Sequence, residues 1–247
     1  MKLSKGSISL FLCVFMAIGL CAQDLYQKGQ LHLKKGKTID AYIQINFEFP
    51  QRFQQNITYV TPKDYDKYLQ SGKLKGSMKE KLNPGDIKGF TLDNGTVFKT
   101  VRYADLTGKA IKMIPKKMCL EQTAQGAIEV YKLYSRTTGS INHELADMIF
   151  EDRANLINYI QDNFQILVQK DNKNPTNIMQ VNLLNYIGDN PRVKENYTNN
   201  HYGFRNQFTE QQKMGKYVNK KYEAAFLSMV NDYNQEATEG SEARSEE

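Results

Sequence analysis

The sequence predicts an α+β protein in which an antiparallel β-sandwich or partly open barrel is followed by a helical C-terminal region packed on the sheet. Residues 23–141 alternate apolar and polar side chains in short runs separated by turn residues, which predicts seven or eight strands. The short connections between these runs favour antiparallel over parallel pairing. From residue 142 the apolar spacing becomes that of helices.

The first residues have the composition of a secretory signal. Lys2 and Lys5 give a positive start, and residues 8–20 form an uncharged, mostly apolar run of 13 residues, too short to span a membrane comfortably. Ala22 is a small residue placed directly before a polar stretch. We therefore expect a signal peptide at 1–22 and an exported mature protein that is periplasmic, associated with the outer membrane, or secreted.

Two of the three cysteines, Cys13 and Cys21, lie in this signal. A bacterial lipoprotein signal needs a small residue directly before its cysteine, whereas Leu20 precedes Cys21. This favours loss of Cys21 with the signal, with lipidation or an uncleaved anchor as the alternatives. The mature chain then holds only Cys119, cannot form an internal disulfide, and depends on its core for stability. We expect Cys119 to be a packed apolar residue rather than a reactive thiol.

Three features locate the strands. Apolar and polar residues alternate over 39–49, which predicts a half-buried strand ended by Pro50. Asn94 and Gly95 lie between two alternating runs and predict a two-residue hairpin turn, because both residues tolerate positive φ angles. A further hairpin is predicted at Gln125 and Gly126.

A short helix is predicted within the β-rich region, over residues 62–72. Pro62 suits a first helical turn and Gly72 suits a stop. A second helical pattern covers 141–160 and is interrupted at Asp152 and Arg153.

The C-terminal region, 142–235, is predicted to be mainly helical. It includes a helix over 178–187 and a final long helix in which Thr209 and Gln212 form a capping-box pattern. Residues spaced at three and four along this last helix form one apolar stripe: Val218, Tyr222, Ala225, Met229 and Tyr233. The acidic, polar segment 236–247 is predicted to be disordered.

Several stretches resemble uncharacterised exported proteins of Gram-negative bacteria of the Bacteroidota type. The resemblance spans about residues 20–205 and is one of layout. It rests on a signal ending in "AQ" followed by the stretches "KKGKTIDAYI", "NPGDIKGFTLDNGTVFKTV", "IEVYKLY", "VQKDN" and "IGDNPRVKENY". It implies an envelope location with a β-rich front and helices behind. That group has no assigned reaction, so the resemblance carries no catalytic residue over to this chain.

The chain is moderately basic, with a formal net charge of +6. Removing Lys2 and Lys5 leaves +4, and the acidic tail makes the folded body about +8. Positive charge favours contact with anionic surfaces such as phosphate-bearing lipids or acidic glycans, and it also serves solubility. Export disfavours nucleic acid as a partner, and no motif for binding it is present.

The sequence lacks the common catalytic motifs or contains them only in part. The sequence has no Gly-x-Ser-x-Gly elbow and no Gly-rich phosphate loop. The stretch "HELAD" puts His143 and Asp147 on one helix face but lacks the second histidine of a metalloprotease helix. Adjacent acids such as Asp64 and Asp66 are typical of a solvated face. We therefore expect no metal site, no cofactor and, on balance, no enzyme.

One basic stretch is the candidate binding site. In "SGKLKGSMKEKL", an extended backbone would point four lysines to one side: Lys73, Lys75, Lys79 and Lys81. Such a row could bind a polyanion. The alternative is protection of a sheet edge, where lysines deter edge-to-edge pairing.

These observations together predict an exported cell-envelope protein that acts as a non-catalytic binding or structural module. Its partner would be an envelope protein or an anionic glycan or lipid surface. Two alternatives stay open: an envelope hydrolase acting on glycan, lipid or peptide with a site assembled from distant residues, and an outer-membrane assembly factor.

Overall fold

The computed structural model describes residues 25–104, 115–136, 147–149, 152–171, 173–204 and 217–245, with side chains described to Thr238. The expected signal at 1–22 lies outside these residues. None of the helices in the described ranges is both long and apolar enough to cross a membrane.

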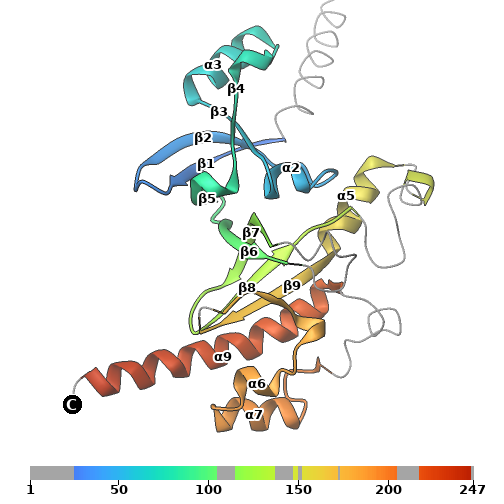
Figure 1. Cartoon of the computed structure of the whole chain (residues 1–247). Coiled ribbons are helices and arrows are strands. Elements are labelled where there is room, and N and C mark those ends of the chain that lie inside the picture. Colours follow the sequence, from blue (N-terminus) through green and yellow to red (C-terminus); the bar gives the residue numbers. More distant parts are fainter. Residues whose placement is uncertain are drawn as a thin grey trace, which may run out of the picture.

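The structure confirms the α+β class, with an antiparallel sheet that stays open (Figure 1). Within the described residues the sheet has 11 strands in the order β10-β9-β8-β7-β6-β5-β1-β2-β3-β4, and β11 pairs with β9. The strands are β1 (Tyr26–Leu33), β2 (Thr38–Gln44), β3 (Ile57–Val60), β4 (Lys79–Leu82), β5 (Ile87–Leu92), β6 (Val97–Tyr103), β7 (Lys116–Ala124), β8 (Ile128–Leu133), β9 (Asn163–Lys170), β10 (Thr176–Asn177) and β11 (Val218–Asn219).

The helices fall into two groups along the chain. Near β3 and β4 the chain forms α2 (Gln51–Gln54), α3 (Pro62–Ser71) and the 3-10 turns η1 (Gly76–Met78) and η2 (Pro84–Asp86). After β8 it forms α5 (Arg153–Asp162), η4 (Ile178–Gln180), α6 (Leu184–Ile187), α7 (Pro191–Thr198) and α9 (Lys220–Ser245). Figure 1 shows α3 and β4 at one end of the molecule and α6, α7 and α9 at the other.

Strands β6–β9 bury apolar side chains on both faces. One face, which we call the inner face, joins the main core beneath α9 through Phe98, Cys119, Val130, Ile166 and their neighbours. The opposite face, the outer face, carries a second cluster made of Val101, Tyr103, Met118, Leu120, Tyr131, Leu133 and Leu167. Alternation along each strand assigns its side chains to one face or the other, except at the irregularity between Gln122 and Ala124 in β7.

The hairpin at Asn94 and Gly95 forms, but its loop is longer than predicted. Thr91 pairs with Val97, and Leu92 still donates its N–H to the carbonyl of Thr96, which leaves three residues in the loop. Gly95 adopts a positive φ of 88°, whereas Asn94 does not. A three-residue loop that ends in a left-handed glycine needs only one residue with positive φ.

The strand predicted over 39–49 ends early, and the prediction that Pro50 terminates it is wrong. β2 stops at Gln44, and Pro50 instead precedes the short helix α2. Phe47 leaves the sheet and packs edge-on against Phe53 and Tyr134, with ring centroids 5.3 and 5.0 Å apart. Burial of these rings in the core therefore overrides the local alternation.

The predicted helix over 62–72 is confirmed as α3. Thr61 caps it by accepting a hydrogen bond from the N–H of Asp64 at 3.3 Å, and Pro62 occupies the first turn. Gly72 ends the helix in the left-handed conformation, with φ of 66°, and donates its N–H to Tyr68.

The predicted interruption of the helical pattern is confirmed at Asp152, which is extended between the helical residues 147–149 and α5, whereas Arg153 is the first residue of α5. The carboxylate of Asp152 accepts a hydrogen bond from the N–H of Ala154 at 2.9 Å, so Asp152 is the N-cap of α5. The helix predicted over 178–187 is also divided, into η4 and α6.

The last helix, α9, begins at Lys220 rather than near Thr209, which lies outside the described residues with Gln212. Val218 belongs to β11. The buried side of α9 follows the predicted stripe and is broader than it: Tyr222, Glu223, Phe226, Met229, Val230 and Tyr233. The helix continues to Ser245 and so covers most of the segment 236–247.

Candidate functional site

The four lysines of the predicted binding site lie at an edge of the sheet. All four are exposed, and Lys79 and Lys81 lie on β4, which pairs with β3 at the end of the strand order. The turn η1 interrupts the stretch, so Lys73 and Lys75 precede the strand instead of extending it. The four lysines therefore form two pairs rather than one row.

The apolar residues between these lysines face the protein. Leu74 and Met78 are half-buried against an aromatic cluster beneath α3 that consists of Tyr26, Val60, Tyr65 and Tyr68. Within this region Tyr65 stacks on Tyr42, with ring centroids 3.6 Å apart. The two lysine pairs therefore lie on a segment whose apolar side chains pack against the rest of the protein.

Charge is divided unequally along the chain. Residues 25–104 contain 14 Lys and Arg against seven Asp and Glu, whereas residues 115–247 contain 15 against 18. The positive charge of the protein is therefore concentrated in the half that ends at the β4 edge.

A polar pocket of about 270 Å³ lies at the other end of the sheet, beside the β7–β8 turn. Its lining comes from β6, the β7–β8 turn, β8 and the end of β9, and consists of Lys99, Gly126, Ala127, Glu129, Gln169, Lys170 and Asp171. Glu129 pairs directly with Gln169 across β8 and β9, so both side chains project from the outer face.

The carboxylate of Glu129 organises the floor of this pocket. It accepts hydrogen bonds from Lys99 Nζ at 2.5 Å, from Gln122 at 3.3 Å and from the Tyr131 hydroxyl at 2.7 Å. Burial alone would raise the pKa of Glu129, but the bonds from Lys99 and Tyr131 outweigh it and lower this pKa. We call Lys99, Gln122, Glu129 and Tyr131 the outer cluster.

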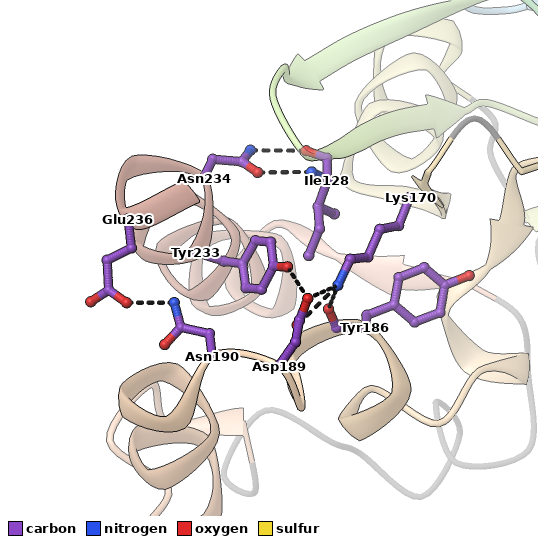
Figure 2. Close-up of polar contacts among 8 residues, drawn as sticks. All are labelled: Ile128, Lys170, Tyr186, Asp189, Asn190, Tyr233, Asn234 and Glu236. Carbon is purple, nitrogen blue, oxygen red and sulfur yellow. Dashed lines mark hydrogen bonds and ion pairs between the residues drawn. The ribbon is translucent and has the colours of Figure 1, made fainter. Parts of the chain in front are cut away.

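The turn that forms one wall is fixed to α9. Figure 2 shows the amide of Asn234 paired with the main chain of Ile128, accepting from its N–H at 2.8 Å and donating to its carbonyl at 2.9 Å. Gly126 has φ of 149°, and a Cβ there would lie 2.6 Å from Asn234 Cγ. Glycine is therefore required for this close approach.

The end of β9 is fixed in a similar way (Figure 2). Lys170 Nζ donates to the carbonyl of Tyr186 at 2.7 Å and to both carboxylate oxygens of Asp189 at 3.0 and 2.8 Å. The hydroxyl of Tyr233 donates to the same carboxylate at 2.8 Å. Two walls of the pocket are thus held by side chains of α9 and the α6–α7 connection.

A second charged group, the inner cluster, lies on the opposite face of the same strands. Lys132 Nζ is 3.1 Å from Glu223 and 3.6 Å from Glu121, and it lies 4.3 Å from the centroid of the Phe164 ring. The Tyr134 hydroxyl donates to Glu121 at 2.6 Å. Burial raises the pKa of Glu223 more than Lys132 lowers it, and burial with the charge of Glu121 raises the pKa of Tyr134.

Cys119 is fully buried on the inner face, in agreement with a packing role. Its Sγ lies 3.4 Å from the hydroxyl of Thr100, and burial raises the pKa of the thiol to about 11. A thiol in this state is a poor nucleophile at neutral pH. His32 contacts Thr91 and Thr38, and His143 lies outside the described residues.

Two of the acids singled out in the sequence have structural partners. Asp147 pairs with Arg136, and Asp64 pairs with Lys67 at 2.6 Å on α3. Within the described part of the chain, no group of three histidines, cysteines or carboxylates is arranged to hold a metal ion.

Sequence reasoning missed both the pocket and the inner cluster. The pocket residues come from separate strands, and each one is ordinary for a polar strand position. The inner cluster did leave a signal, because Lys132 shares the parity of the buried Ile128 and Val130 on β8.

In comparisons with known proteins, no protein-family model, no curated protein and no solved structure matches this chain.

Proposed function

We propose that this chain is an exported, non-catalytic binding module of the cell envelope that contacts an anionic partner through its basic half. The observation that carries the proposal is the concentration of charge: residues 25–104 have twice as many basic as acidic residues, and four exposed lysines flank or occupy the edge strand β4. Clustered positive charge raises the local concentration of polyanions and accelerates their association.

Export supports the choice of partner. The signal-like segment 1–22 directs the chain to a compartment whose abundant polyanions are phosphate-bearing lipids and acidic glycans. Edge protection by lysine agrees with the same placement of β4, so the experiment must separate the two readings.

The test replaces Lys73, Lys75, Lys79 and Lys81 together by Gln in the mature chain. Retention is measured on phosphatidylglycerol vesicles and on a sulfated glycan, with phosphatidylcholine vesicles as the neutral surface. The control variant removes four other exposed lysines and has the same net charge: Lys35, Lys37, Lys88 and Lys116, all changed to Gln.

We expect the β4-edge variant to lose most of its retention on at least one anionic surface, and the control variant to lose clearly less. Retention by the unmodified protein should fall as salt is added. Equal losses in the two variants would show a general charge effect, and unchanged retention would leave edge protection as the account of these lysines.

A further inference from the structure

The polar pocket at the β7–β8 turn has the features of a ligand site that is separate from the basic edge. We propose that it binds a neutral polyhydroxylated ligand of about one ring, such as a single sugar unit of a glycan. This inference does not depend on the proposed function, because the pocket contains none of the β4-edge lysines and its lining disfavours an anion.

Size limits the ligand. The pocket holds about 270 Å³. Pockets for drug-sized molecules range from roughly 300 to 1,000 Å³, so this one suits a smaller molecule. Part of the lining, including Gly126, Ala127 and Asp171, is exposed, which leaves an opening through which a ring could remain attached to a longer chain.

The charges in the lining disfavour an anion. Lys99 is neutralised by Glu129, and Lys170 is neutralised by Asp189. The carboxylate of Asp171 then adds negative charge at the rim. Among small molecules of this size, an uncharged one avoids repulsion by these carboxylates.

Hydroxyl groups match the remaining polar groups. The amide of Gln169 can both donate and accept, the ammonium of Lys99 keeps N–H donors beyond the one used by Glu129, and the main chain at Gly126 and Ala127 borders the pocket. A sugar hydroxyl also donates and accepts, so adjacent hydroxyls on a ring can satisfy such a mixed set.

The lining is held in place before any ligand arrives. Asn234 fixes the turn, Asp189 and Tyr233 fix the end of β9 through Lys170, and Glu129 is held by three donors. Figure 2 shows that the first two of these anchors come from the same side, that of α9 and the α6–α7 connection. Pre-organisation of this kind reduces the entropy lost on binding.

The test is amide NMR of the ¹⁵N-labelled mature chain titrated with glucose and with N-acetylglucosamine. Glucose 6-phosphate serves as the charged counterpart. At millimolar concentrations we expect at least one neutral sugar to shift the amides of Gly126, Ala127 and Gln169, and glucose 6-phosphate to shift them less. Gln169→Ala should weaken binding about fivefold or more, which corresponds to loss of roughly 1 kcal/mol.

Gln51→Ala, a change of the same type at an exposed position on α2, is the matched control and should leave the titration unchanged. Absence of shifts at the pocket amides with both neutral sugars would overturn the proposal. Equal or tighter binding of glucose 6-phosphate, or an unchanged titration in Gln169→Ala, would overturn it as well. None of these results depends on the lysines of the β4 edge, so the two proposals can fail separately.

Discussion

The two faces of strands β6–β9 carry ion pairs of the same chemistry in different surroundings. In the inner cluster the side chains of Lys132 and Glu223 are 10% and 11% exposed, whereas in the outer cluster those of Lys99 and Glu129 are 42% and 20% exposed. The helix α9 covers the inner pair, and the outer pair borders a pocket. Burial therefore decides whether a Lys–Glu pair serves stability or remains accessible from solvent.

The largest difference between the faces is expected on removal of the lysine. Lys132→Met leaves the buried Glu223 and the partly buried Glu121 without their cation, and we expect it to lower the free energy of unfolding by about 3–5 kcal/mol. Lys99→Met is the matched change on the outer face and should cost less than about 1 kcal/mol. Urea denaturation measures both losses in free energy, with the m-value expected to be the same in each variant as in the unmodified protein. Similar losses in the two variants would contradict the assignment of different roles.

An effect of intermediate size is expected at the contact between α9 and the β7–β8 turn, which borders the pocket. Asn234→Ala removes the hydrogen bonds to the main chain of Ile128 and to the carbonyl of Gln125. We expect a loss of about 1–3 kcal/mol, with faster amide hydrogen exchange at Ile128. Asn231→Ala, at an exposed position of the same helix, is the control and should change stability by less than about 0.5 kcal/mol. Unaltered exchange at Ile128 would show that the turn is fixed by other contacts.

The smallest expected effect is the pH dependence of folding stability, and its sign should differ between the two faces. The pKa of Glu223 is raised, so its contribution to stability is fully present below the unfolded pKa of about 4.3 and is lost as pH rises through the folded pKa. The pKa of Glu129 is lowered, so its contribution is present above about 4.3 and is lost as pH falls through the folded pKa.

Thermal unfolding of Glu223→Gln and Glu129→Gln between acid and neutral pH tests this difference. Relative to the unmodified protein, Glu223→Gln should become more stable as pH rises, and Glu129→Gln should become less stable. Slopes of the same sign would mean that the two carboxylates have similar environments.

Much of the fold could be predicted from local patterns. Alternation predicted the strands around Ile43 and Val101, and the residues around Pro62 and Gly72 predicted both ends of α3, because strand pleat and helix caps depend on neighbours in sequence. The early end of β2 could not be predicted in this way, since it depends on Phe47 packing against Tyr134, far along the chain.

The two candidate sites also differ in how far they could be predicted from local sequence. The β4-edge lysines are contiguous in sequence, so their clustering was visible before the fold was known, although the interruption by η1 was not. The pocket requires Lys99, Glu129 and Gln169 to meet across β6, β8 and β9. Only the strand order brings them together, and single-residue properties do not encode that order.

The strand order also sets a distance between the two proposed sites. β9 and β4 lie near opposite edges of one continuous sheet, and β5 joins the two halves by pairing with both β1 and β6. Eight steps between neighbouring strands give a contour of at most about 40 Å along the sheet. Each of these strands is hydrogen-bonded to the next. We therefore expect the sheet to act as a stiff spacer that holds a ligand bound in the pocket at a fixed distance from an anionic surface bound at the β4 edge.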